Sequence, residues 1–420
     1  MNWPLVPLGE LGADIPNACV GGPFGSELTT RDYVDTGVPV IRGTNLAEQG
    51  FVDDGFVYVS EEKAESLRQN QARPGDIAFT QRGTIGQVAL IPKRSRHPRY
   101  VISQSQMKLT PDLQRVDPRY LVHFFKSPHA LAYLQNNTLA TGVPHINLTI
   151  LRRLPVPLPP LPEQRRIADI LDKADAIRRK RKQAIALTDQ LLRSTFLEMF
   201  GDPVTNPKRW AEIPFGSLVA ETQLGLVRAA SEQGPNLQYP YIRMNAIEDN
   251  GKLNLSDLSK VDASSEDAMK HQLKEGDFLF NTRNTKELVG KSAVFHGNGL
   301  YLFNNNILRV RFRDEYDPDY ICSYFQTRRG KADLEKRKSG TTSVFAVYQR
   351  SLNEIPILMP PADMQRKYAS VCSRVRTITD KLQTSLYCTT NLFDSLVSHT
   401  FRGELSTSNQ FELQLSMFNK

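Results

Sequence analysis

Cysteines are few in this sequence and long apolar runs are missing, and both shortages narrow what the chain can be. Its 420 residues include four cysteines, Cys19, Cys322, Cys372 and Cys388, and no two of them form a CxxC pair. Their scatter argues against a structural zinc site and a disulfide framework, and it favours a reducing cytoplasm. The longest apolar runs fall well short of the ~18 residues that a membrane span needs. The N-terminal residues also lack the basic start and apolar stretch of a signal peptide. We therefore expect a cytoplasmic protein without a membrane partner.

Catalytic and cofactor-binding motifs are missing as well. Neither HExxH nor GxSxG occurs, and the seven histidines show no spacing typical of metal ligands. Residues 289–292 resemble the end of a phosphate-binding loop, but Thr285 stands where that loop needs its first glycine. Residues 117–120 and 317–320 faintly resemble the Asp-Pro-Pro-Tyr loop of amino-methyltransferases, yet both lack the second proline, and helix initiation explains them better. We predict a non-catalytic protein that holds no cofactor or metal itself; a single-chain nuclease or methyltransferase with cryptic motifs is the alternative.

The excess of positive charge is moderate. Lys and Arg number 53 against 45 Asp and Glu, which gives a net charge of +8 and a pI of about 9.2. This balance is compatible with a phosphate backbone as partner, although many unrelated proteins are equally basic. Residues 178–182 are five consecutive cations. They face DNA phosphates or an acidic partner, or they form an ordinary solvated helix face.

An internal repeat organises the chain. Four short segments recur in the same order at an offset of 200 or 201 residues. Because this period is too long for a solenoid or propeller repeat, each copy is predicted to be a domain followed by a helix. The alternative is two unrelated domains that share turn signals. The matching segments are residues 40–42 and 241–243, 74–79 and 275–280, 117–121 and 317–321, and 158–164 and 359–365.

Each copy begins with mixed α/β sequence. Asp117-Pro118 and Asp317-Pro318 have the pattern of an N-cap followed by proline at the first helical position. A proline cluster follows, at residues 155–162 or 356–361. We expect it to continue neither a sheet nor a helix and to act as a stiff joint. Strands are predicted at residues 38–41, 77–80 and 308–312.

A long helix follows each proline cluster, over residues 163–200 and 363–401, and Gly201 and Gly403 stand where C-terminal caps belong. Such a helix of ~38 residues extends about 57 Å and cannot bury an apolar stripe alone. We therefore expect the two to pair as an antiparallel coiled coil; two separate surface helices, each packed on its own domain, are the alternative. The first stripe comprises Ile167, Ile170, Leu171, Ala174, Ile177, Ala184, Ile185, Leu191, Leu192, Phe196 and Met199. The second, a heptad, comprises Met364, Tyr368, Val371, Val375, Ile378, Leu382, Leu392 and Leu396, with Ser385 and Thr389 as polar interruptions.

These features predict an α+β fold. Two duplicated mixed α/β domains are joined and closed by two long helices, which form an antiparallel coiled coil with a pseudo-twofold axis. The predicted segments are a first domain over 1–160, a first long helix over 161–201, a second domain over 202–361, a second long helix over 362–405 and a polar tail over 406–420.

Polar clusters recur in the two domains. Arg, Asn and Gln are the side chains that form paired hydrogen bonds with guanine or adenine edges. For any single residue, turn capping or strand-end bonding explains the cluster equally well. The candidates for base readout are Asn45, Gln81, Gln104 and Gln106 in the first copy, and Asn245, Asn284, Asn304, Asn305 and Asn306 in the second.

Nearly the whole chain resembles the specificity (S) subunit of Type I restriction–modification systems. The step from the second proline cluster to the second long helix departs from the family pattern at residues 361–365, but Gln365 and the heptad are kept. The order of the motifs is more specific than any one of them. They are the sequence Pro-Leu-Pro-Pro-Leu-Pro-Glu-Gln-Arg-Arg-Ile at residues 157–167, residues 75–77 with 83–86, Thr141-Gly142 with His145-Ile146, and the helix ends at 191–201 and 396–405.

The resemblance implies two target-recognition domains, each reading one half of a split, asymmetric site in double-stranded DNA. The helices would set the gap and dock two modification (methyltransferase) subunits, and restriction (translocase–nuclease) subunits would join them. S-adenosylmethionine, ATP and Mg²⁺ would belong to those partners. The competing function is an adaptor whose coiled coil bundles other helices and whose domains bind peptides.

Residues that match between the copies cannot by themselves distinguish two different half-sites. We predict that they form the structural frame of each domain or contact DNA phosphates, and phosphate contacts position a protein on DNA without specifying sequence. Unmatched residues, such as Gln81 against Thr282, are then predicted to carry the specificity. The matched residues are Arg42, Arg82 and Thr84 in the first copy and Arg243, Arg283 and Thr285 in the second.

Overall fold

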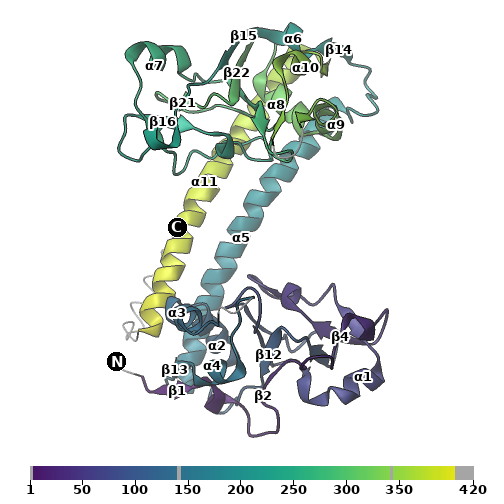
Figure 1. The fold of residues 1–420 in the computed structure, drawn as a ribbon, viewed down its shortest axis with the longest axis vertical. Coiled ribbons are helices and arrows are strands. Elements are labelled where there is room, and N and C mark those ends of the chain that lie inside the picture. Colours follow the sequence, from purple (N-terminus) through teal and green to yellow (C-terminus); the bar gives the residue numbers. More distant parts are fainter. Residues whose placement is uncertain (1–2, 140–142, 341–343, 403–420) are drawn as a thin grey trace. The chain divides into compact units, whose positions relative to one another are not determined.

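The computed structural model describes residues 3–139, 143–340 and 344–402, and the chain divides into two compact units (Figure 1). Unit 1 comprises Met1–Gln183 and Gln383–Lys420, and unit 2 comprises Ala184–Leu382. The division falls inside both long helices, so each unit contains a mixed α/β domain and one part of each helix. The domain boundaries at residues 160, 201, 361 and 405 stay predictions.

The two larger sheets of unit 1 have four and five strands. The four-stranded sheet has the order β10-β9-β12-β2, and the five-stranded sheet has the order β3-β7-β4-β11-β8. The predicted strands at 38–41 and 77–80 are confirmed as β4 and β9. The strands of these sheets are β2 (Cys19–Gly21), β3 (Tyr33–Val34), β4 (Val38–Ile41), β7 (Val57–Val59), β8 (Gln71–Ala72), β9 (Ile77–Thr80), β10 (Val88–Leu90), β11 (Tyr100–Ile102) and β12 (Gln106–Leu109).

Unit 2 repeats this plan. Its four-stranded sheet has the order β15-β22-β18-β20, and two three-stranded sheets have the orders β17-β16-β21 and β19-β24-β23. The parallel pair β16·β21 corresponds to β4·β11, and the antiparallel pair β18·β22 corresponds to β9·β12. The duplication predicted from the sequence is therefore confirmed in the topology. The strands are β15 (Val219–Leu224), β16 (Tyr239–Ile242), β17 (Lys260–Val261), β18 (Phe278–Asn281), β19 (Arg283–Asn284), β20 (Ser292–Val294), β21 (Leu302–Phe303), β22 (Ile307–Phe312), β23 (Ser339–Gly340) and β24 (Phe345–Ala346).

Two of the short helices, α2 and α8, begin where the sequence predicts. Asp117 caps α2 by accepting the Arg119 N–H at 2.8 Å, and Asp317 caps α8 by accepting the Asp319 N–H at 2.9 Å. The carboxylate caps and the prolines at the first helical position fix both helix starts. The short helices are α1 (Glu61–Ser66), α2 (Pro118–Phe125), α3 (Pro128–Asn136) and α4 (Leu148–Arg153) in unit 1, and α6 (Phe215–Leu218), α7 (Ser265–His271), α8 (Pro318–Gln326), α9 (Arg328–Glu335) and α10 (Gln349–Asn353) in unit 2.

The proline clusters do not behave as predicted. Part of each forms a strand, β13 (Pro155–Pro157) or β25 (Pro356–Met359), which pairs with β1 (Leu5–Pro7) or β14 (Ala211–Pro214). In unit 1 the flanking ladder bonds run from the Leu8 N–H to the Leu154 oxygen and from the Leu158 N–H to the Pro4 oxygen, both at 2.9 Å. Positions 155 and 157 alternate with these bonded positions. The β1·β13 pair therefore tolerates proline at these two positions, because the partner strand accepts no backbone N–H from them.

A glutamine side chain links the start of α2, and of α8, to the long helix that follows it. Buried Gln164 accepts the Asp117 N–H at 2.9 Å and donates to the Pro159 oxygen at 2.8 Å. Gln365 repeats this with the Asp317 N–H at 3.0 Å and the Pro360 oxygen at 2.8 Å. The two glutamines occupy matching positions of the repeat, so the sequence match reflects a shared hydrogen-bonded junction.

The two long helices are confirmed. α5 (Leu161–Phe200) and α11 (Ala362–Phe401) each contain 40 residues. Gly201 ends α5 with a φ of +80°, and its N–H donates to the Leu197 oxygen at 2.8 Å. Glycine suits this left-handed position because it carries no Cβ. Gly403 lies outside the described residues.

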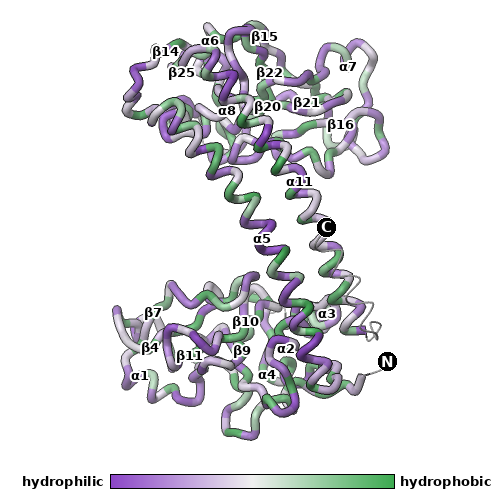
Figure 2. Tube along the Cα trace, turned by 180° about the vertical axis from the view of Figure 1, so that it is seen from behind, coloured by the Kyte–Doolittle hydropathy of each residue, from purple (hydrophilic) through white to green (hydrophobic). Residues whose placement is uncertain are grey.

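Within each unit the two helix segments run antiparallel. In unit 1 the Arg178 guanidinium lies over the Phe393 ring, and Arg181 donates to the Ser385 oxygen at 3.3 Å. In unit 2 Thr379 donates to the Thr188 hydroxyl oxygen at 3.1 Å. Figure 2 shows apolar and polar residues alternating along both helices, as paired helices with one solvated face require.

The buried stripe of α11 differs from the predicted heptad by one residue at every second position. Ile378, placed in the stripe by its hydropathy, is 52% exposed, and Thr379 is buried instead. Cys372 and Phe393 are likewise buried where Val371 and Leu392 were predicted. The prediction was also wrong for one member of the α5 stripe, because Leu191 is 50% exposed.

Charged contacts fasten α2 and α8 to the long helices with opposite polarity. In unit 1 Arg119 of α2 pairs with Asp172 of α5 at 3.1 Å. In unit 2 Asp319 of α8 pairs with Arg376 of α11, also at 3.1 Å. His296 bonds to Asp319 at 2.9 Å. Burial lowers the pKa of His296, but the hydrogen bond and charge of Asp319 and the hydrogen bond to Glu275 together outweigh it, and the net shift is upward.

Candidate nucleic-acid interface

Three loops meet at one end of the neighbouring sheets of unit 1. The Ser103 N–H donates to the Ile41 oxygen at 3.0 Å, and the Gln81 N–H donates to the Ser105 oxygen at 2.7 Å. These backbone bonds bring together segments that are far apart in the sequence. We call the assembly the polar edge of unit 1. It comprises residues 42–45 after β4, residues 81–86 after β9, and residues 103–105 between β11 and β12.

Unit 2 builds the same edge with the same backbone bonds. The Asn304 N–H donates to the Ile242 oxygen at 2.9 Å, and the Thr282 N–H donates to the Asn306 oxygen at 2.9 Å. Each bond lies about one repeat length from its counterpart in unit 1. The polar edge of unit 2 comprises residues 243–246 after β16, residues 282–285 after β18, and residues 304–306 between β21 and β22.

A further segment closes each edge, and sequence reasoning did not place it there. In unit 1 the Gly83 N–H donates to the Pro144 oxygen at 3.2 Å, and the Ile146 N–H donates to the Gln81 oxygen at 3.0 Å. In unit 2 the Val347 N–H donates to the Thr282 oxygen at 2.9 Å. The one signal in the sequence was the family motif that includes His145 and Ile146. Its other part, Thr141 and Gly142, lies outside the described residues.

Two residues predicted to read bases face inward instead. Asn45 is 1% exposed; its amide donates to the Val52 and Asp54 oxygens at 3.0 Å each, and its own oxygen accepts the Arg42 N–H at 3.0 Å. Gln106 is fully buried within β12, where every side chain is buried. Neither amide can reach a base edge in this fold, so both belong to the frame of the edge.

Three further candidates use their amides to hold the loops. Gln104 is exposed, but its amide donates to the Gly25 and Leu28 oxygens. Asn304 donates to the Tyr241 hydroxyl at 3.1 Å and accepts the Asn306 N–H at 2.9 Å. Asn284 accepts the Thr285 N–H at 2.8 Å. The side chains of Gln104, Asn304 and Asn284 thus position the edges through contacts within the protein.

The remaining candidates differ in how freely they reach the solvent. Arg42 is half-buried and donates to the Gly55 oxygen at 3.3 Å, which makes it part of the frame, whereas its match Arg243 is exposed. Gln81, Asn305 and Asn306 are half-buried, and the Asn306 backbone oxygen accepts the Thr282 hydroxyl at 2.8 Å. The exposed candidates are Arg82, Thr84, Arg243, Asn245, Arg283 and Thr285.

Comparison with known proteins finds relatives of one kind. Residues 25–187 match the family described as Type I restriction modification DNA specificity domain. The Type I restriction enzyme EcoKI specificity subunit of Escherichia coli (strain K12) is 22% identical over 429 residues, which cover 96% of this chain and 89% of that protein. The StySPI specificity subunit of Salmonella potsdam is 22% identical over 411 residues, which cover 92% and 86%. The chain is therefore similar to Type I specificity subunits over nearly its whole length, and residues 25–187 match the specificity domain of that family.

Solved structures support the fold of this chain. The S subunit of the Type I restriction–modification system from M. genitalium matches with a TM-score of 0.60 at 14% identity, covering 96% of each chain. A chain from a structure of the assembly and conformational transition of the type I R-M system matches with a TM-score of 0.51 at 18% identity, covering 96% of this chain and 98% of that one. The predicted α+β fold and the predicted resemblance to specificity subunits are confirmed, and this similarity favours a recognition subunit over the alternative of a nuclease or methyltransferase.

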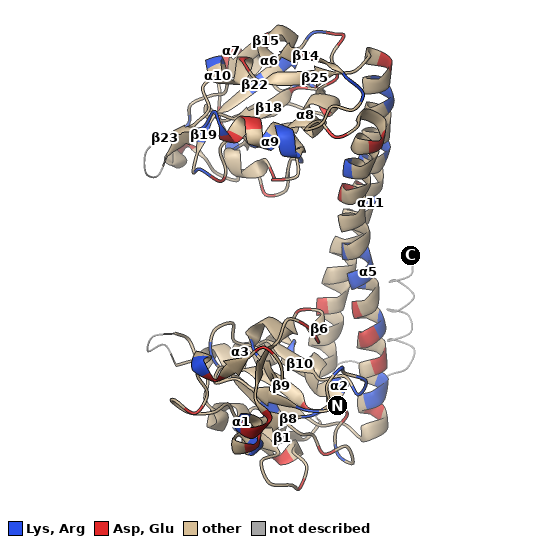
Figure 3. Cartoon of the chain, turned by 90° about the vertical axis from the view of Figure 1, so that its right-hand side faces the viewer, with Lys and Arg blue, Asp and Glu red and all other residues tan. Residues whose placement is uncertain are grey.

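The basic run at residues 178–182 is largely occupied by contacts within unit 1. A hairpin of β5 (Leu46–Ala47) and β6 (Gly50–Phe51) places Glu48 beside it. Glu48 pairs with Lys182 at 2.9 Å and with Arg178 at 3.3 Å, and Arg178 also pairs with Asp175 at 2.8 Å. The hydrogen bond from Lys182 lowers the pKa of Glu48. Figure 3 shows anions interspersed with cations along α5. This run therefore anchors the hairpin to the helix.

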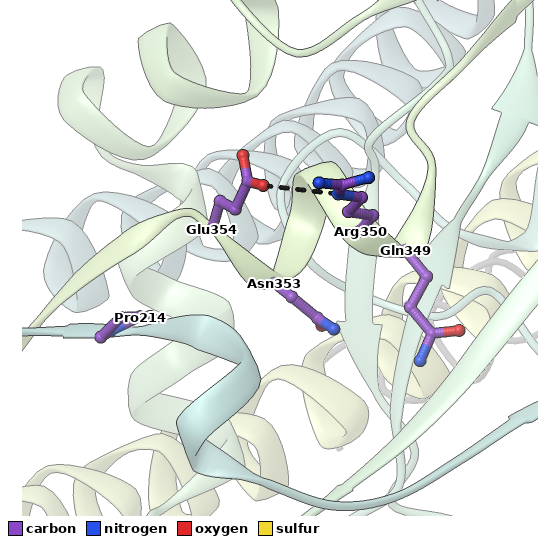
Figure 4. A pocket seen from close by; sticks show the side chains of 5 residues that line it. All are labelled: Pro214, Gln349, Arg350, Asn353 and Glu354. Carbon is purple, nitrogen blue, oxygen red and sulfur yellow. Dashed lines mark ion pairs between the residues drawn. The ribbon is translucent and has the colours of Figure 1, made fainter.

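Other features of the chain do not contribute to the polar edges. A cleft of about 610 Å³ in unit 2 is lined by residues of β14 and α10 and their surroundings (Figure 4). Arg350 of α10 and Glu354 at the C-terminal end of that helix form a solvent-exposed ion pair at 3.9 Å on one wall of the cleft. In the described part of the chain no group of His, Cys, Asp or Glu could hold a metal ion, and no helix there is long and apolar enough to cross a membrane.

Proposed function

We propose that this chain reads DNA sequence for a Type I restriction–modification complex, with each unit reading one half of a bipartite, asymmetric site. The observation that carries the proposal is the polar edge, which is built twice by the same backbone bonds but from different side chains. Two identical edges would read two identical half-sites. Edges with a shared frame and different side chains suit two different half-sites.

Within each edge, matched and unmatched residues take different roles. Arg82 and Arg283 are exposed at matching positions, and a guanidinium there suits contact with a phosphate in either half-site. Gln81 stands where the second copy has Thr282, and an amide can form two hydrogen bonds to an adenine while a hydroxyl cannot. Gln81 is therefore the leading candidate for base readout by unit 1.

The long helices supply the remaining parts of the function. Leu187 and Leu191 of α5 are 54% and 50% exposed and lie four residues apart, so they share one apolar strip of the helix. Such a strip suits a protein partner, and we assign it to the modification (methyltransferase) subunits, two per chain. Restriction (translocase–nuclease) subunits would join that complex. S-adenosylmethionine, ATP and Mg²⁺ would be held by these partners, and the complex would act on double-stranded DNA in the cytoplasm.

The test is selection of sites from a random duplex library by the complex of this chain with its methyltransferase subunits. We expect two short specified segments separated by a gap of fixed length. Gln81→Ala should relax one base pair of one segment and leave the other segment unchanged. An equal effect on both segments, or selection of a single continuous site, would contradict the assignment of one half-site to each unit.

The gap is tested separately. Seven residues, about two helical turns, would be inserted in both α5 and α11 at the boundaries between the units, after Gln183 and after Leu382. The selected segments should stay the same while the gap between them changes. An unchanged gap would show that the helices do not set the spacing.

A further inference from the structure

A loop that carries an exposed aromatic side chain joins the polar edge of unit 1. It begins directly after β2 with Gly22 and Pro23, which are both buried. Phe24 follows and is 79% exposed. A single exposed apolar residue is common on protein surfaces. What distinguishes Phe24 is how firmly its loop is held against the edge.

The loop backbone packs directly on residues 103–105 of the edge. A Cβ atom on Gly22 would lie 2.0 Å from the Ser103 oxygen, so only glycine permits this approach. Gln104 donates its amide hydrogens to the Gly25 and Leu28 oxygens beyond Phe24. The Phe24 N–H itself donates to the Glu27 carboxylate at 3.0 Å. The phenyl ring is thus presented to the solvent from a backbone that is fixed on both sides.

Unit 2 repeats the arrangement with a different side chain. The strand register pairs Gly21 with Met107 and Leu224 with Leu308, so Gly225 is the counterpart of Gly22. A Cβ atom on Gly225 would lie 2.2 Å from the Phe303 oxygen.

The two residues that follow Gly225 also match. Leu226 is buried like Pro23, and Val227 is 67% exposed like Phe24. The Arg228 side chain donates to the Val227 oxygen at 2.8 Å and fixes that backbone too. Each copy therefore holds one apolar side chain in water beside its polar edge, and the two side chains differ.

We propose that Phe24 and Val227 are specificity-determining residues, each of which contacts a thymine methyl group in the half-site read by its own unit. The inference rests on the proposed function. The methyl group is the one apolar feature that a base pair shows in the major groove, and phenyl and aliphatic side chains are the groups that contact it. Fixed backbones keep the entropy cost of this contact low. The difference between a phenyl ring and a valine side chain follows the rule that unmatched residues carry sequence information.

The experiment uses the full chain in complex with its methyltransferase subunits and a duplex library. Phe24→Ala should relax the preference for one A·T pair in one half-site and weaken binding to the best site about tenfold, as expected when an apolar contact of this size is lost. Phe24→Leu should keep most of the preference. Val227→Ala should act in the same way on the other half-site.

A matched control is Ile15→Ala. Ile15 is 53% exposed and precedes β2, whereas Phe24 follows it, so the two lie at opposite ends of that strand. We expect the control to leave the selected site unchanged. Replacing the selected thymine by deoxyuridine, which removes the methyl group alone, should weaken wild-type binding but not the binding of Phe24→Ala.

Two results would overturn the inference while the proposed function stands: an unchanged library profile for Phe24→Ala, or an equal loss on deoxyuridine substitution in wild type and variant. A wild-type complex that selects no bipartite site would overturn the proposed function and this inference with it. Because Phe24 is exposed, its variants should unfold at the wild-type temperature.

Discussion

Replacing Gln164 by alanine should open the junction between α2 and α5 without disturbing unit 2. Gln164 is fully buried, and its side chain makes three hydrogen bonds. It accepts the Asp117 N–H at 2.9 Å and donates to the Arg115 and Pro159 oxygens at 3.0 and 2.8 Å. A buried hydrogen bond contributes about 1 kcal/mol net, and a partner left unpaired costs at least that much. The variant should therefore lose about 3 kcal/mol of local stability.

The matching residue of unit 2 allows the magnitude to be checked. Gln365 accepts the Asp317 N–H at 3.0 Å and donates to the Pro360 oxygen at 2.8 Å, but its remaining contact is with the Met359 sulfur at 3.2 Å. A thioether is a weak acceptor. Gln365→Ala should therefore cost less, about 2 kcal/mol.

Hydrogen exchange measured peptide by peptide is the suitable assay, because one global free energy is poorly defined for a chain of two units. Gln164→Ala should lower protection in α2 by about a hundredfold, since 1.4 kcal/mol corresponds to tenfold. Gln365→Ala should act on α8 alone. Gln190→Ala, at an exposed position of α5, serves as the control and should change neither. Equal losses in α2 and α8 from either variant would refute the reasoning, because the two junctions would then not be separate.

The remaining predictions concern charge. Arg82→Ala should weaken binding to every DNA sequence and lower the slope of log affinity against log salt by about one; relaxed preference at one base pair would contradict its phosphate role. Glu48→Lys should remove the ion pair with Arg178 and lower the local stability of the β5–β6 hairpin, which would be measured as faster hydrogen exchange there. The loss should be less than about 1 kcal/mol because the Glu48 side chain is 63% exposed. The pKa of His296 is raised in the folded state, so folding favours the protonated ring. The resulting stabilisation of unit 2 is complete at pH values below the ordinary histidine pKa of about 6.5, and it is lost as the pH rises through the raised pKa. The stability difference from His296→Gln should accordingly be larger at pH 6 than at pH 8 in urea unfolding; a difference that grows with pH would show that the Asp319 bond does not hold the proton.

Sequence reasoning was most successful where local chemistry decides the structure. An aspartate followed by proline predicts a helix start because the carboxylate caps the first turn and the ring fixes φ, and Asp117 and Asp317 do so in both copies. The prediction for the proline clusters was wrong because it depends on a distant partner strand. Whether proline is tolerated in a strand depends on which N–H groups the partner strand requires, and the sequence around Pro155 does not contain that information.

The candidate site was predicted in outline because the repeat located the loops, but not in detail. Asn45 and Gln106 are polar residues at loop or strand ends, where exposure is the ordinary expectation. Both are buried because other segments cover them: residues 52–54 bind the Asn45 amide, and β12 lies between two neighbouring strands. Burial by segments that are distant in the sequence is a property of the folded chain, and it leaves no pattern in the residues next to Asn45 or Gln106.

The one-residue error in the α11 heptad has a physical origin that bears on how the helices pair. Hydropathy favours Ile378 over Thr379 for a buried position, but Thr379 is 3% exposed and donates to the Thr188 hydroxyl oxygen of α5. Two apolar stripes can pair in several registers, whereas the hydrogen bond between Thr379 and Thr188 forms in only one of them. Any shift of one helix segment along the other would break this bond and leave each hydroxyl bonded only within its own helix, to the Val375 and Ile185 oxygens at 2.8 and 2.7 Å. The threonine pair therefore selects the observed register in unit 2, at the expense of the exposed isoleucine, and this selection acts between helices whose sequences lie 191 residues apart.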